Sequence, residues 1–317
     1  MSSEHTLADT RQASSAFGLS VSEGHMPYLG YKTYYRVVGN IEASLAAGMA
    51  PLVVLHGGPG STHNNLEVLD ELGLNGRAIV FYDQLGCGKS YLANHPELWV
   101  AQTWVNELKA LINHLNISEY YLLGQSWGGM LLLEYTLQTK PQGLKGCILS
   151  STLPASQLWA SENHRQARML PLSEWSALCA AERTGDFSSQ AYQQAIDHFM
   201  ELHCCDSSYD EDAPECLRRK KKFGQEAYEV AWGPNELNAT GTLASWNVID
   251  RLHEIEQPTL IISGTDDECT PLIAKTMYDA IPHSTWELFE GCRHMCYIDD
   301  NPRYIRVVKH FLEKNDK

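Results

Sequence analysis

The fold of this chain is decided by the stretch YYLLGQSWGG, residues 120–129. An apolar run comes first, the pattern GxSxG around Ser126 follows, and apolar residues at helical spacing continue from Met130 to Leu137. A strand, a sharp turn and a helix in this order hold a serine on the turn with its hydroxyl exposed, because the flanking glycines leave room for it. The stretch therefore predicts a nucleophilic serine at position 126.

Outward from this stretch, short apolar runs alternate with segments of helical period. The runs that predict buried strands are 52–55, 78–82, 120–123, 147–150, 260–263 and 286–289. Strands that alternate with helices indicate an α/β fold, a mostly parallel sheet flanked by helices on both faces. The alternating segment 31–38 predicts part of an antiparallel edge hairpin.

The alternation stops between Leu153 and Ile249, where the pattern is helical and polar. We interpret this block as an inserted helical cap, or lid, over the carboxyl edge of the sheet, where open α/β sheets place their ligands. The predicted organisation is a polar N-terminal tail (1–20), the first part of the core (21–152), the cap (153–250) and the second part of the core (251–317). The basic run 218–222 is interpreted as a solvated helix face of the cap.

Composition narrows the function classes. The 317 residues carry a formal charge of −15, from 39 acidic and 24 basic side chains, which disfavours nucleic acid and anionic membrane surfaces as partners. No apolar run approaches the roughly 20 residues of a membrane helix, and the polar start shows no signal pattern, so we expect a cytoplasmic protein. Nine cysteines without a CxxC pair favour reduced thiols over zinc, even around Cys204 and Cys205.

A second motif, HGGPG at 56–60, follows the strand 52–55 directly. Glycines let the backbone approach a reacting carbonyl closely and direct an N–H at its oxygen. We expect the N–H groups of Gly58 and Trp127 to form an oxyanion hole, and His56 to support its loop by hydrogen bonds. The segment GCGKS at 86–90 resembles the end of a phosphate-binding loop, but Asp83 stands where that motif requires glycine, so no nucleotide is expected.

A nucleophilic serine needs a base and an acid that orients the base, in the order serine, aspartate, histidine for this strand order. His294, which follows the last predicted strand, is the expected base. The acid should follow the strand 260–263, where Asp266 and Asp267 are adjacent. Only one of two neighbouring residues on a turn can face His294, and we expect Asp267, with Asp266 as the alternative.

These residues carry a family resemblance. The chain resembles the proline iminopeptidases, serine peptidases of the α/β-hydrolase fold that remove an N-terminal residue, and the related L-amino-acid amidases. The matching stretches occur in order at 56–60, 81–90, 124–129, 232–250, 264–271 and 291–295, so the resemblance covers the chain from about Gly24 onward. It implies that Ser126, Asp267 and His294 form the catalytic triad. It also implies that Glu236 and Glu268 bind the free ammonium group of the substrate, and it implies no metal or organic cofactor.

The predicted function is hydrolysis of the amide bond after an unblocked N-terminal residue of a small peptide or an amino-acid amide. Two alternatives stay open: the same residues acting on a specialised small ester, lactone or amide, or a non-catalytic binding protein of the same fold. Cys87 and Cys292 flank the predicted active-site loops, which suggests that thiol reagents inhibit by crowding the site.

Overall fold

The computed structural model describes residues 11–316 and contains a nine-stranded sheet. The strand order is β1-β2-β3-β5-β4-β6-β7-β8-β9. The strands are β1 (Arg11–Ser14), β2 (Ser20–Tyr28), β3 (Tyr31–Val38), β4 (Leu52–Leu55), β5 (Ile79–Tyr82), β6 (Tyr120–Gln125), β7 (Leu144–Ser150), β8 (Thr259–Gly264) and β9 (Ser284–Phe289).

The sheet is antiparallel at one edge and parallel elsewhere. Strands β1, β2, β3 and β5 pair antiparallel, whereas β5, β4, β6, β7, β8 and β9 pair parallel. The predicted mostly parallel sheet, with its edge hairpin at 31–38, is therefore confirmed. Residues 11–14 of the polar tail predicted over 1–20 are exposed, but they pair with 20–23 of β2 and so are not a free tail, while residues 1–10 lie outside the described part.

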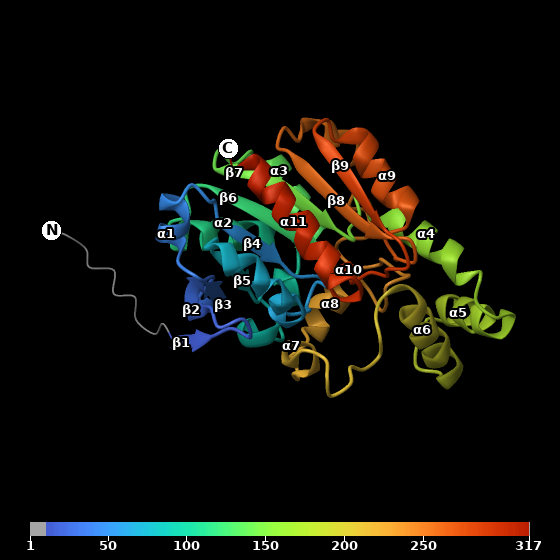
Figure 1. The fold of residues 1–317 in the computed structure, drawn as a ribbon. Helices are drawn as coiled ribbons and strands as arrows, with labels where there is room; N and C mark the ends of the chain where they lie inside the picture. Colours follow the sequence, from blue (N-terminus) through green and yellow to red (C-terminus); the bar gives the residue numbers. More distant parts are fainter. Residues whose placement is uncertain (1–10, 317) are drawn as a thin grey trace.

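Helices cover both faces of the sheet (Figure 1). Side chains alternate along each strand, so that Val53 and Leu55 of β4 join one apolar cluster and Leu52 and Val54 join the other. The first cluster includes side chains of α2 (Ala101–His114), α3 (Trp127–Thr139) and α9 (Pro271–Ala280); the second includes side chains of η1 (His63–Asn75), α10 (Cys296–Asp299) and α11 (Asn301–Asn315). The remaining short helices outside the 156–231 block are α1 (Ile41–Ala46), η2 (Gly88–Ser90), η3 (Pro96–Leu98) and η4 (Ile249–Glu254).

Five α-helices precede η4 between β7 and β8, where the sequence predicts a cap. They are α4 (Ser156–Ala167), α5 (Leu172–Thr184), α6 (Gln190–His203), α7 (Glu215–Arg218) and α8 (Gln225–Ala231). In Figure 1, α5 and α6 extend to one side of the sheet, and their buried side chains form a separate apolar cluster that includes Leu178, Tyr192 and Phe199. Among the described residues, no helix is long and apolar enough to cross a bilayer.

The basic run 218–222 is not a helix face. Helix α7 ends at Arg218, and the chain then crosses two loops of the core. Lys222 O accepts a hydrogen bond from Gly88 N (2.8 Å), and Gly224 N donates to Gly60 O (2.8 Å). The backbones pass so closely that a Cβ on Gly224 would lie 2.5 Å from Gly86 O. The expected helix is therefore wrong for 219–222, although Arg219, Lys220 and Lys222 are exposed as expected. The segment that follows the helix fastens two core loops to each other.

The same close packing holds α3 against the sheet. A Cβ on Gly128 would overlap the carbonyl oxygen of Leu55 in β4. We expect Gly128→Ala to lower the free energy of unfolding by about 3 kcal/mol, because a backbone oxygen cannot move aside as a flexible side chain can. Urea unfolding would measure the change.

Gly48→Ala is the matched control. Gly48 has a φ of +75°, and a methyl group added there would meet no atom within 4 Å, so only backbone strain of about 1 kcal/mol is expected. Equal losses for the two variants would contradict the steric account of Gly128.

Candidate active site

Ser126 lies on the turn between β6 and α3 with φ 56° and ψ −125°. This backbone conformation is rare for a residue with a side chain, and the surrounding structure holds it in place. Ser126 N donates to Ser150 O (3.0 Å), and Thr152 Oγ1 donates to Ser126 O (2.7 Å). A Cβ on Gly124 would overlap the backbone of Gly128, which explains why this turn needs small residues on both sides of the serine.

The HGGPG loop lies beside this turn. A Cβ on Gly57 would be 3.1 Å from Ser126 Cβ, and Gly58 has a φ of +114°. Trp127 is the first residue of α3, and the first N–H groups of a helix have no acceptor within the helix. Gly58, Ser126 and Trp127 line one small hollow, so the loop and the helix start both lie next to the serine.

Gln84, which the sequence reasoning missed, joins these two elements. Its Nε2 donates to His56 O (3.0 Å), its backbone N donates to His56 Nε2 (3.0 Å), and its Oε1 accepts a bond from Trp127 Nε1 (2.8 Å). His56 also contacts Gly57 O through Nδ1 (2.9 Å). One side chain therefore fixes the loop of Gly58 relative to the helix of Trp127. The available signals were its place two residues after β5 and its position inside the matching stretch 81–90.

His294 and Asp267 lie together, as the sequence predicts. His294 Nδ1 is 2.8 Å from Asp267 Oδ1, and the carboxylate also accepts bonds from Cys269 N (2.8 Å) and Gly264 N (3.2 Å). Both side chains are buried. Asp266 is exposed, and its backbone contacts Cys292 O, so Asp266 does not face the imidazole.

Ser126 and His294 line one cavity of about 340 Å³. The wall includes Gly58 and the polar side chains of Ser126, Glu236, Glu268 and His294. Apolar side chains line the rest, namely Ile196, Met200, Phe223, Tyr228 and Met295, together with Cys204. Neither Cys87 nor Cys292 is among the described lining residues, so the cysteine in this wall is one that the sequence reasoning had not singled out for reactivity.

Glu236 and Glu268 contribute two carboxylates to this wall. Glu236 Oε1 accepts a bond from Tyr228 Oη (2.8 Å). Glu268 is 1% exposed, and neither of its carboxylate oxygens has a hydrogen-bond partner among the described residues. His294 Nδ1 lies 3.9 Å from Glu268 Oε2. Such a buried carboxylate is costly unless a cation or a proton joins it.

The charges around the cavity shift the pKa values of these groups. Burial raises the pKa of Glu268 well above its ordinary value, and the carboxylates of Glu236 and Asp267 raise it further, against the effect of His294. Burial also raises the pKa of Glu236, while Tyr228 and His294 act against this rise. For His294, burial alone would lower the pKa, but Asp267, Glu268 and Glu236 together raise it to about 9.

Helix α4 forms hydrogen bonds with the turn that carries Asp267 and Glu268. Gln166 Nε2 donates to Asp267 O (2.9 Å), Asn163 Nδ2 donates to Glu268 O (3.3 Å), and Glu162 accepts a bond from Thr270 Oγ1 (2.7 Å). From the same helix, the Trp159 ring lies edge-on to the His294 ring at 5.6 Å. No sequence pattern indicated these contacts, because they join residues about 100 positions apart.

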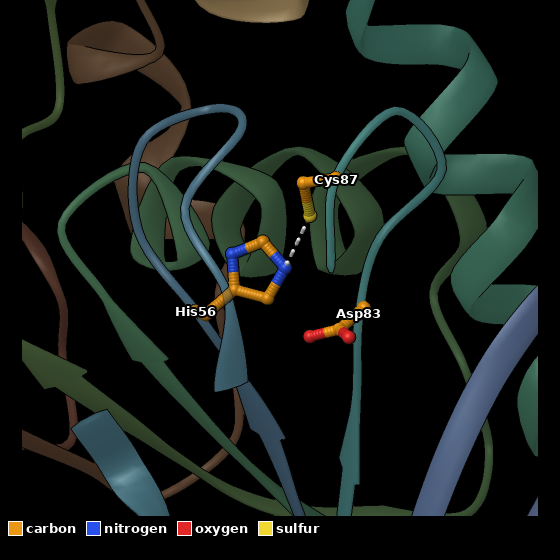
Figure 2. Close-up of side chains that lie close together, drawn as sticks. All are labelled: His56, Asp83 and Cys87. Carbon is orange, nitrogen blue, oxygen red and sulfur yellow. Dashed lines mark hydrogen bonds between the residues drawn. The ribbon is translucent and has the colours of Figure 1, made fainter. Parts of the chain in front are cut away.

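A separate group of possible metal ligands is formed by His56, Asp83 and Cys87, which lie close together (Figure 2). Their polar atoms already have partners. Asp83 accepts bonds from His63 Nδ1 (2.6 Å) and Lys89 N (2.8 Å), and His56 Nε2 accepts one from Gln84 N. This hydrogen bonding fits a structural support of the loops better than a metal site, which would need free lone pairs on all three ligands.

Comparisons with known proteins agree with this geometry. Residues 50–301 match the family model for the alpha/beta hydrolase fold. The chain is 51% identical to the proline iminopeptidase of Clostridioides difficile over 94% of this chain and 100% of that protein, and 51% identical to that of Lactiplantibacillus plantarum over 92% and 100%.

The chain is also similar to solved structures. The crystal structure of the proline iminopeptidase of Mycobacterium smegmatis has a TM-score of 0.80 and 30% identity, over 93% of this chain and 99% of that one. The crystal structure of VinJ has a TM-score of 0.83 and 33% identity, over 92% and 98%.

The titration of His294 tests the charge arrangement directly. We expect a pKa of about 9 in the wild type by NMR, assigned by difference with His294→Gln. A carboxylate stabilises the imidazolium, so Glu268→Gln should lower that pKa, by about one pH unit. Glu287→Gln, which removes a carboxylate outside the cavity, is the control and should leave the pKa of His294 unchanged. An unchanged titration in Glu268→Gln would show that Glu268 carries no charge next to His294.

Proposed function

We propose that this chain, which belongs to the proline iminopeptidases of the α/β-hydrolase fold family, releases N-terminal proline from small peptides through an acyl-enzyme on Ser126. Its family makes it a serine hydrolase of the aminopeptidase class. In this proposal Ser126 is the nucleophile, His294 the base and Asp267 the orienting acid. The N–H groups of Gly58 and Trp127 bind the oxyanion, and Glu236 and Glu268 bind the substrate ammonium group.

The observation that carries the proposal is the unpaired carboxylate of Glu268. It is buried in the cavity wall that Ser126 and Glu236 also line, and it lacks a hydrogen-bond partner among the described residues. A free N-terminal ammonium supplies both the charge and the N–H donors that this group needs. An N-blocked substrate supplies neither, so the two carboxylates would keep the His294 imidazolium as their cation, and the protonated imidazole could not act as a base.

A second, smaller hollow adjoins the first and supports the preference for a ring. Gly58, Ser126 and Glu236 line both hollows, and the smaller one adds the apolar side chains of Met130, Leu153, Trp159 and Trp232. A prolyl residue that places its nitrogen at the glutamates and its carbonyl at Ser126 would direct the edge of its ring toward this hollow, which has a volume of about 10 Å³. Burial of each methylene contributes about 0.8 kcal/mol.

The proposed reaction proceeds in two halves. His294 takes the proton of the Ser126 hydroxyl as the oxygen attacks the carbonyl, and the oxyanion receives hydrogen bonds from Gly58 and Trp127. Protonated His294 then gives that proton to the leaving amine. A water molecule, deprotonated by the same histidine, attacks the acyl-enzyme and releases free proline and Ser126.

Substrate charge and base strength are linked in this scheme. In the free enzyme the three acidic side chains raise the pKa of His294 to about 9, so the imidazole is mostly protonated at neutral pH. A bound ammonium offsets the charge of Glu236 and Glu268, and it therefore lowers that pKa. The substrate that binds correctly thus generates the neutral base that its own cleavage requires.

Removal of the nucleophile tests the chemistry. We expect Ser126→Ala to reduce kcat for a prolyl arylamide by roughly four to six orders of magnitude, because no acyl-enzyme can form. Ser161→Ala, which removes an exposed serine hydroxyl from α4, is the control. A fluorophosphonate probe should label the wild type and Ser161→Ala but not Ser126→Ala. Labelling or turnover that persists in Ser126→Ala would exclude Ser126 as the nucleophile.

Blocking the substrate amine tests the recognition site separately. We expect N-acetyl-prolyl arylamide to be cleaved at least about 100-fold more slowly than prolyl arylamide, because the carboxylates lose their cation. Glu236→Gln should lower kcat/KM for the free amine by roughly 100-fold and change hydrolysis of a simple aryl ester only a few-fold. Equal cleavage of free and acetylated substrates would reject amine recognition, while the hydrolase chemistry would stand.

A further inference from the structure

Two adjacent thiols lie where α6 ends. Cys204 and Cys205 both direct their backbone N–H groups to Met200 O, at 2.7 and 3.1 Å, so the chain makes a tight turn at this point. Cys204 is buried and lines the cavity of Ser126, whereas Cys205 is partly exposed. One thiol of the pair therefore faces the substrate cavity, and the other can be reached from outside.

The surroundings give the two thiols different reactivity. The neighbouring Cys204 thiol lowers the pKa of Cys205 to about 7; burial opposes this, and the positive charges of His294 and Arg293 favour it. The Cys205 thiol in turn raises the pKa of Cys204, as do burial and the carboxylates of Glu268 and Glu236. Cys205 is thus partly thiolate at neutral pH and is the nucleophile of the pair, because thiolates rather than thiols attack. Cys204 stays a thiol.

The segment that carries the pair also supports the triad. His203 O accepts a hydrogen bond from His294 N (3.0 Å), and His203 Nδ1 contacts Asp266 O (2.8 Å). Arg293 Nη1 donates to Glu201 O (3.1 Å) and to Asp206 Oδ1 (2.9 Å). A change in the backbone at 204–205 therefore acts on two parts of the proposed triad: the loop that carries His294 and the turn that carries Asp267.

We propose that Cys205 and Cys204 form a modification site for peroxides, which convert the pair to a vicinal disulfide and thereby inactivate the enzyme reversibly. The Cys205 thiolate attacks one oxygen of hydrogen peroxide, the O–O bond breaks, and hydroxide leaves, which gives a sulfenic acid. The sulfur of Cys204 then attacks the sulfur of Cys205, and water leaves. In total, two thiols and one peroxide give one disulfide and two waters, so the thiols are oxidised and the peroxide is reduced.

Geometry makes the closed ring both disruptive and reversible. Adjacent Cα atoms are about 3.8 Å apart across a trans peptide, less than the roughly 4.4–6.8 Å that disulfides prefer. The backbone must therefore distort when the bond forms, and a strained disulfide is reduced more easily than a relaxed one. Closure also withdraws the Cys204 sulfur from the cavity wall.

The experiment treats the full-length enzyme with a small excess of hydrogen peroxide, stops the reaction with catalase, and measures intact mass and prolyl arylamide hydrolysis. We expect the protein to lose the mass of two hydrogens, with the bond mapped to the peptide containing 204–205. We expect kcat/KM to fall by roughly 10- to 100-fold, as for a misplaced catalytic group, and dithiothreitol to restore it. The mass measurement does not depend on the proposed function, so failure of the one is distinguishable from failure of the other.

Variants separate this pair from the other close thiols, Cys292 and Cys296. Cys205→Ser should resist inactivation, and Cys204→Ser should accumulate a sulfenic acid at Cys205 that dimedone traps. Cys292→Ser is the matched control and should be inactivated at the wild-type rate. The proposal is overturned if Cys205→Ser loses activity as fast as the wild type, if the disulfide maps to 292 and 296, or if the bond at 204–205 forms without loss of activity.

Discussion

The proposed chemistry depends on three carboxylates that lie close to one imidazole beside a small cavity. Asp267, Glu268 and Glu236 surround one imidazole, and two of the three are buried. Asp267 is stabilised by the N–H groups of Gly264 and Cys269, whereas Glu268 has no such donors among the described residues. The hydrogen bonds thus satisfy one of the two adjacent carboxylates within the protein and leave the other for the ligand that we propose. Buried charges of one sign cannot stay uncompensated, so this division favours a cationic substrate.

The sheet and the inserted helices share the work of building this cavity. Loops that follow the parallel strands carry Gly58, Ser126, Glu268 and His294, because the carboxyl ends of these strands meet at one edge of the sheet. Glu236 and Cys204 come from the block between β7 and β8. Neither part holds both the nucleophile and the two glutamates, so the proposed peptidase site exists only when both parts are folded together.

Local patterns allowed the sequence to predict much of the fold and site. The parallel strands show as short apolar runs, and Ser126 lies in a motif whose strand, turn and helix are all contiguous. Chain order pointed to His294 and narrowed the acid to two neighbours, of which Asp267 faces the imidazole. The family resemblance added Glu236 and Glu268, which no spacing rule indicates, and the family itself is confirmed by the comparisons.

Contacts between distant segments were beyond the reach of sequence patterns. Strand β1 is fully exposed and polar, so its pairing with β2 has no hydrophobic signature. The bridging role of Gln84, and the segment 219–224 across the glycine loops, depend on how loops meet in space. The basic run was assigned to a helix because charge alone does not separate a helix from an extended crossing.

The hydrogen bonds from α4 to the turn at 267–270 have one more consequence, which concerns how molecules enter and leave the cavity. Gln166, Asn163 and Glu162 tie the inserted block to the very turn that orients the imidazole. The inserted block therefore cannot move away from the sheet as one unit without breaking these hydrogen bonds and disturbing Asp267. Under the proposed function, a substrate then reaches Ser126 through the cavity as it stands, which favours the unfolded end of a short peptide over the end of a folded protein.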